Sequence, residues 1–276
     1  MRRAWPRYLA VFRTFARNSL VRDMMFKTNF LIQCVGSVLW MGVTLCFYVL
    51  IFNYADEIGK GTGWHKYEYF VFLSTAMLVN SLMQAFVMPN AQEFSEMIRT
   101  GNLDFALLKP IDTQFLVSFQ RIEWSAFSNF GFGLLLLAYS LSQLNYVPGA
   151  AAIVLYPIYI VCGVAIMYSV MICLAGTSIW MGRNQSLYDF WFYITNFSRY
   201  PMEIYNGTWG NPLRWLLTFL VPVLVAINVP ARFMAMQLDR EKWYLAGFAI
   251  FATVAALWLT RRIFILALRS YRSASS

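Results

Sequence analysis

Charged side chains are scarce in this sequence. Asp, Glu, Lys and Arg make up 13% of the 276 residues and hydrophobic residues 59%, whereas about a quarter of the residues of a soluble domain are charged. Because about 20 apolar residues in a helix cross a bilayer, we expect an all-α, polytopic membrane protein. A β-barrel is excluded, since the apolar stretches do not alternate with a period of two. The stretches without any charge are 28–55, 69–92, 124–182, 215–231 and 243–260.

Residues that usually carry chemistry are equally scarce. The sequence has one histidine, His65, in a glycine-rich loop, and four cysteines that all fall within apolar stretches: Cys34, Cys46, Cys162 and Cys173. Thiols in such stretches are expected to pack as small hydrophobic groups rather than to form disulfides or bind a metal. Motifs of hydrolases, zinc sites and phosphate-binding loops are missing, and "GKGTGWHK" has the wrong order for a Gly-x-x-x-x-Gly-Lys-Ser/Thr loop.

These absences exclude several classes of function. Without a phosphate-binding loop the chain is not expected to hydrolyse ATP by itself. Ion-coupled carriers usually hold an ionisable residue inside a span, and the first four predicted spans contain only Arg121 and Glu123, both near the start of the third. The sequence therefore predicts a helical scaffold that is not an enzyme, binds no cofactor or metal, and takes its energy from a partner.

Basic residues outnumber acidic ones, 22 to 13. They flank the apolar stretches, so membrane topology explains the excess and nucleic acid is not an expected partner. By the positive-inside rule both termini are cytoplasmic and the number of crossings is even. Residues 1–28 carry aromatic and aliphatic side chains on one helical face and arginines on another, which predicts an amphipathic helix at the membrane surface. The flanking basic residues are Arg2, Arg3, Arg7, Arg13, Arg17, Arg22 and Lys27 at one end, and Arg261, Arg262, Arg269 and Arg272 at the other.

Residues 29–265 are expected to form six transmembrane helices, and residues 266–276 a cytoplasmic tail. Five crossings follow directly from the apolar stretches, at about 29–52, 69–89, 115–143, 150–181 and 243–263.

The fifth crossing along the chain has two candidates, because two apolar pieces lie between the cytoplasmic Arg183 and the outer residues 239–242. We expect 187–198 to cross. Residues 212–235, which contain Pro222 and Pro230, are then expected to enter the membrane and return as a re-entrant helical pair. In the alternative arrangement 213–235 crosses, and 187–211 lies at the surface.

A compact polar loop, residues 90–112, separates the second and third crossings: "NAQEFSEMIRTGNLDFALLKPID". The loop must face the cytoplasm if the first span leaves it and the second returns. "AQEFSEMIRTG" predicts two to three turns of helix that end at Gly101, and "LDFALLKPID" predicts a second short helix that ends before Pro110.

With this loop in place, the chain resembles the permease subunits of type-two ATP-binding-cassette exporters. The resemblance is carried by "EFSEMIRTGNLDFALLKPID", whose part "GNLDFALLKP" is similar to a Gly-x-Leu-Asp-x-x-Leu-x-x-Pro signature, and by "RYPMEIY" and "FLVPVLVAINVPARFM" before the last span. It implies export of a hydrophobic or amphipathic substrate across a bacterial cytoplasmic membrane. A lipid, a glycolipid, a peptide and a hydrophobic drug all remain open as cargo.

The resemblance also implies partners. The loop is expected to be a coupling helix that docks on a separate ABC ATPase subunit, which binds ATP and Mg²⁺. Two ATPase copies are expected to work with two permeases, the second an identical or a sister chain, and spans one, two and five are expected to line the path. The residues that resemblance and chemistry assign to ATPase coupling are Glu93, Glu96, Met97, Arg99, Gly101, Leu103, Asp104, Leu107, Lys109 and Pro110, with Phe105 as a further apolar contact.

Two rival functions stay open at this stage. A membrane enzyme acting on lipid head groups would depend on polar residues at the membrane border such as Glu123, Asp189 or Glu203. A structural anchor in an envelope assembly would bind partners without ATP-stimulated transport.

Overall fold

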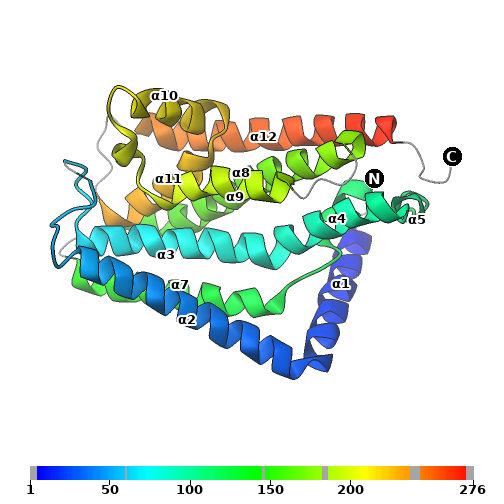
Figure 1. Ribbon diagram of the computed structural model, residues 1–276, viewed down its shortest axis with the longest axis horizontal. Helices are drawn as coiled ribbons and strands as arrows, with labels where there is room; N and C mark the ends of the chain where they lie inside the picture. Colours follow the sequence, from blue (N-terminus) through cyan, green and yellow to red (C-terminus); the bar gives the residue numbers. More distant parts are fainter. Residues whose placement is uncertain (1–4, 60, 145–146, 182–185, 237–242, 272–276) are drawn as a thin grey trace.

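The structure, a computed structural model, describes residues 5–59, 61–144, 147–181, 186–236 and 243–271. Within these ranges every regular element is a helix, which confirms the all-α prediction. Helices α2 (Lys27–Ile51), α3 (Lys66–Leu82), α7 (Phe127–Gln143), α8 (Ala150–Met181) and α12 (Trp243–Ser270) run along the long axis of the molecule (Figure 1). Arg183, residues 239–242, Arg2, Arg3 and Arg272, on which the predicted topology partly rests, lie outside the described residues.

Among the described residues, five helical segments are long and apolar enough to cross a membrane, or six if the bent pair at 210–235 counts as one: Lys27–Ile51, Lys66–Thr100, Trp124–Gln143, Ala150–Trp180 and Trp243–Ser270. The second lies in the middle of the bundle, with 78% of its most apolar window buried, whereas α2 lies at the edge with 6%. The last helix continues to Ser270, so the predicted start of a tail at residue 266 falls within α12.

The N-terminal segment forms a separate helix, α1 (Trp5–Met25), as predicted. It lies across one end of the bundle, the end that also holds α4 (Met88–Thr100) and α5 (Leu103–Leu107) (Figure 1). The loop before α3 and helix α10 (Gly210–Trp215) lie at the opposite end.

The second predicted span does not end at Pro89. A π-helical turn, η1 (Met83–Val87), links α3 to α4, and the helical segment continues for 35 residues to Thr100. Pro89 is tolerated because it occupies the first turn of α4, where the N–H group that proline lacks would contribute little hydrogen bonding to the helix. The consequence is a single long element that joins the buried centre of the bundle to the polar loop.

The third predicted span, 115–143, is interrupted. The chain forms α6 (Thr113–Phe119), leaves the helix at residues 120–123, and resumes with η2 (Trp124–Ala126) and α7. The backbone N–H groups at the break bond to groups distant in sequence, so they need no helical partner. Arg121 N–H donates to Asn90 Oδ1 (2.8 Å), Ile122 to Ser19 Oγ (3.1 Å), Glu123 to the Ala85 carbonyl in the π turn (2.9 Å) and Trp124 to Asp23 Oδ2 (3.2 Å).

Residues 210–235 form a bent helical pair at the place where a re-entrant pair was expected, 212–235, and we refer to it as the re-entrant pair. Segments Gly210–Leu220 and Val223–Ala235 (α11) meet at an angle of 87°. One end is held by a hydrogen bond from Arg214 to Asn206 and the other by an ion pair from Arg232 to Glu203, so both ends lie near the same turn, η4 (Met202–Tyr205). Between them α11 reaches the middle of α8.

The fifth crossing is only partly helical. Helix α9 (Ser186–Asn196) has 11 residues, which is about 16 Å of helix and less than a bilayer core. The 3₁₀ turn η3 (Phe197–Arg199) and the extended residues after it carry the chain on to η4 at the opposite end. Helix α9 alone is thus too short to span, and both arrangements, a crossing at 187–198 or one at 213–235, stay predictions.

Candidate functional site

The polar loop folds into a short rigid stub at the end of α4. Gly101 adopts φ 75°, the left-handed conformation that glycine allows, and its N–H bonds to the Ile98 carbonyl. Helix α5 follows at once and ends before the exposed Lys109 and Pro110. The predicted helix, its stop at Gly101 and the second short helix are confirmed.

The stub exposes an apolar patch that we define as Phe105, Leu107 and Leu108. Their side chains are 69%, 40% and 81% exposed, at the end of the bundle where α1 lies (Figure 1). Phe105 and Leu107 were expected from the sequence to be available to a partner, but Leu108 was not. A spacing of three residues between Phe105 and Leu108 was the signal that could have found it.

Two predicted contact residues point the other way. Met97 is 8% exposed and Leu103 fully buried, because both pack in the core together with Phe94, whose ring lies 5.6 Å from that of Phe264 in α12. Met97, expected as an apolar partner contact, and Leu103, expected as a coupling residue, therefore anchor the stub to the bundle in this structure. In α5, which has five residues, the sequence gives too few turns to separate a buried face from an exposed one.

The predicted charged residues Glu93, Glu96 and Arg99 lie on α4, and Asp104 lies on α5. Glu96 and Arg99 form an ion pair on the exposed face of α4, with Arg99 Nε 2.8 Å from Glu96 Oε2. Glu93 Oε2 lies 4.0 Å from Nη1 of Arg121, a residue in the break between α6 and α7. Asp104 is half-buried beside Tyr271, at the end of α12, and its carboxylate together with burial raises the pKa of that hydroxyl.

Asp112 joins the stub to two other elements. It caps α6 by accepting from Phe115 N–H (3.0 Å), and it accepts from Arg261 of α12 at 3.1 and 2.5 Å. Its own N–H donates to the Tyr8 hydroxyl of α1 (3.3 Å). Burial opposes ionisation, but the bonds from Arg261 and Phe115 outweigh it and lower the pKa of Asp112 below its usual value.

Two substitutions separate the roles of Asp112. Asp112→Ala removes both the helix cap and the ion pair, and it is expected to lower the free energy of unfolding by about 1 kcal/mol. Asp112→Asn keeps a capping side chain and loses only the partly exposed ion pair, so it should lower the free energy of unfolding by about 0.5 kcal/mol or less. Because the folded pKa is depressed, the contribution of the pair is present at neutral pH and is lost as the pH falls through that value. Detergent unfolding at pH 7 and near pH 3 checks both points, and equal losses for the two variants would contradict the capping role.

A groove of about 840 Å³ runs along the bundle between α2, α3 with α4, the start of α7 and α9. On α3 and α4 its lining extends from Leu73 to Gln92, about 28 Å of helix and close to the thickness of a bilayer core. It is lined by the elements that correspond to predicted spans one, two and five. Its polar lining consists mainly of amides and hydroxyls, on Gln33, Asn80, Gln84, Gln92, Asn129, Ser37, Thr44, Ser125 and Thr195.

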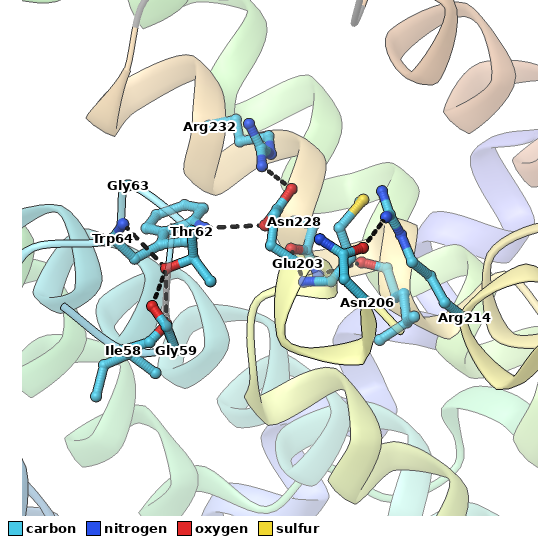
Figure 2. Close-up of polar contacts among 12 residues, drawn as sticks. Ile58, Gly59, Thr62, Gly63, Trp64, Glu203, Asn206, Arg214, Asn228 and Arg232 are labelled. Carbon is cyan, nitrogen blue, oxygen red and sulfur yellow. Dashed lines mark hydrogen bonds and ion pairs between the residues drawn. The ribbon is translucent and has the colours of Figure 1, made fainter. Parts of the chain in front are cut away.

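Figure 2 shows the polar cluster at the other end of the molecule. Glu203 accepts from Trp64 Nε1 (3.0 Å) and forms an ion pair with Arg232 of α11, whose guanidinium lies over the Trp64 ring at 5.5 Å. The two charged side chains are 11% and 7% exposed. Next to them, Asn228 Oδ1 accepts from Met202 N–H (2.8 Å). The cluster fastens the re-entrant pair to η4 and to the loop before α3.

This geometry bears on the residues that a lipid-modifying enzyme would use. Glu203 is engaged with Arg232 and Trp64, and Glu123 lies in the groove and accepts from the Ser125 hydroxyl (3.1 Å). The side chain of Asp189 lies outside the described residues. Among the side chains that are described, no group of three His, Cys, Asp or Glu residues is arranged to hold a metal ion.

Comparison with known proteins gives a family. Residues 38–275 match the family model described as ABC-2 family transporter protein. No curated protein and no solved structure matches the chain. The family match begins within α2 and covers the stub, most of the groove lining and the re-entrant pair. The chain therefore belongs to the ABC-2 transporter family, as a multi-pass membrane permease of an ABC transporter.

Proposed function

We propose that the chain is one of two permeases of an exporter and that its stub docks on a separate ABC ATPase subunit. The single observation that supports the docking is the exposed patch of Phe105, Leu107 and Leu108. An apolar patch that lies beyond the end of a span, outside the bilayer, is normally covered by a partner. The Glu96–Arg99 pair at its border would supply polar contacts and register. Association with an ABC ATPase is itself implied by the family.

The proposed mechanism is mechanical. ATP and Mg²⁺ are held by two ATPase copies, and this chain contributes no residue to that chemistry. Closure of the ATPases would displace the stub, and the helix from Lys66 to Thr100, about 52 Å long, would carry the displacement into the centre of the bundle. Bonds of Asp112 to Arg261 and Tyr8 would move α12 and α1 with it.

The groove is the proposed substrate path. It lies on the side of α2, the least buried of the candidate spans, where a second permease, identical or a sister chain, would close it. In this proposal the protein lies in a bacterial cytoplasmic membrane with both termini cytoplasmic, as the basic residues of α1 and of the end of α12 favour. Outward movement of an amphipathic cargo along the groove is the proposed reaction.

Removing the apolar patch tests the docking. The double variant Phe105→Ser, Leu108→Ser is expected to weaken binding of the purified ATPase at least about 100-fold, since two apolar side chains lose their buried contact. Co-purification and ATPase stimulation measure it. A matched control is Phe251→Ser, Val254→Ser, which has the same spacing and similar exposure, 68% and 64%, on α12. Equal effects of the two double variants would refute the docking site.

Exchanging the charges of Glu96 and Arg99 is a second test of the docking. Glu96→Arg with Arg99→Glu keeps an ion pair within α4 but reverses the charges that a partner meets. We expect binding to weaken by about tenfold, more at low salt than at high salt. Binding that persists without ATP-stimulated transport would instead support a structural anchor.

A further inference from the structure

The groove has unused hydrogen-bonding capacity. Gln33, Asn80 and Gln92 line it, and within the ranges that the structure covers their side-chain amides form no hydrogen bond. Polar amides in a helical bundle usually bond to a neighbouring helix. Amides that instead face a groove indicate that something else bonds to them.

Two more side chains in the groove wall have an unmet polar atom. Asn129 Oδ1, an acceptor, and Trp191 Nε1, a donor, are buried without a partner, and the two residues are 4% and 5% exposed. Asn129 bonds to Gln84 through its amide nitrogen only, at 3.4 Å. An unmet buried polar atom is destabilising, so its retention in the wall of a groove favours a ligand that supplies the missing bond.

The lining also contains aromatic rings and few charges. Trp40 and Tyr48 of α2 face the groove, as does Tyr200 beyond α9. The acid and the base among the described lining residues are Glu123, just before η2, and Arg199, at the end of η3. A charged head group inside the bilayer would need an opposite charge along its way, and between these two positions the lining is uncharged.

We propose that the groove binds an amphiphile whose head group is uncharged and rich in hydroxyls, such as a sugar or polyol, and that Asn129 and Trp191 determine this specificity. A hydroxyl both donates and accepts, so one kind of group satisfies Asn129 Oδ1, Trp191 Nε1–H and the free amides. The apolar face of a sugar ring packs on aromatic rings, and the tail remains in lipid beside α2. This inference deepens the proposed function and rests on the groove being the substrate path.

Photolabelling of the full chain in phosphatidylcholine nanodiscs tests the proposal. Probes that share a dodecyl tail with a diazirine carry a maltosyl, a phosphate or a trimethylammonium head, and the labelled residues are mapped by mass spectrometry. We expect the maltosyl probe to label α2, α3 and α9, and dodecyl maltoside but not maltose to compete with it. Stronger groove labelling by either charged probe, or equal competition by maltose, would overturn the proposal.

Substitutions identify the specificity residues. Asn129→Leu removes the acceptor at similar volume, and Trp191→Phe keeps an aromatic ring but removes the N–H. Each is expected to reduce maltosyl labelling about fivefold, as the loss of one hydrogen bond predicts, and to leave labelling by the charged probes unchanged. Trp180→Phe, at a position 51% exposed and outside the groove lining, is the control. If a variant reduces labelling by all three probes equally, the residue has a merely structural role, and its assignment as a specificity residue is overturned.

The assay contains no ATPase, which separates this inference from the proposed function. If the groove is not labelled but the ATPase still docks, only the proposed cargo class is refuted, and the exporter proposal stands. Selective labelling in a chain that binds no ATPase would keep the cargo class and refute the exporter.

Discussion

Glu203→Gln is expected to lower the free energy of unfolding by about 3–5 kcal/mol, the cost of leaving a buried charge without its partner. Arg232 is 7% exposed on its side chain, and within the described part of the structure Glu203 is its ion-pair partner. The substitution would also weaken the bond from Trp64 Nε1 to the same carboxylate. Titration with sodium dodecyl sulfate in mixed micelles, followed by circular dichroism, measures the loss.

Two further variants isolate the charge. Glu96→Gln makes the same change in an exposed pair, where the side chains are about half exposed, and should cost less than about 1 kcal/mol. Replacing both Glu203 and Arg232 by Met should recover much of the loss, since an apolar pair leaves no buried charge. If Glu203→Gln costs no more than Glu96→Gln, the pair does not hold the re-entrant segment.

Gly163→Ala is expected to cost about 3 kcal/mol, at the upper end of overpacking, and to displace the re-entrant pair. A Cβ at Gly163 would lie 2.3 Å from the carbonyl oxygen of Ala226 and 3.1 Å from its carbonyl carbon. Backbone atoms cannot rotate away as a side chain can, so α8 and α11 must separate. The same titration measures the loss of stability, and transport should fall with it.

Gly131→Ala is the matched control, because it makes the same change in helix α7 where nothing lies within 4 Å of the added carbon. It should be neutral or stabilising by up to about 1 kcal/mol, as alanine is the better helix former. A Gly163→Ala protein as stable as Gly131→Ala would contradict the close approach of α8 to the re-entrant pair.

Which parts of the fold follow from the sequence depends on the range of the interactions. The absence of charge over long stretches requires helices, since backbone groups in lipid must bond within their own segment. Gly101 and the short helix after it follow from equally local chemistry. These predictions need only neighbours along the chain, and they agree with the structure.

Distant partners decide the rest. The break at 120–123 exists because Ser19, Asp23, Ala85 and Asn90 accept its N–H groups, and no residue within the break signals this. Contact with the bundle likewise buries Met97 and leaves Leu108 exposed.

The sequence by itself determined that this chain is a helical membrane protein with a polar stub between two of its spans, because apolar length and charge act through local hydrogen bonding and the solvent. Only the tertiary structure decided which side chains face a partner, which line the groove and which charges pair, as Glu203 does with Arg232. Those properties depend on atoms brought together from separate helices, and hydrophobic patterning does not encode the choice among them.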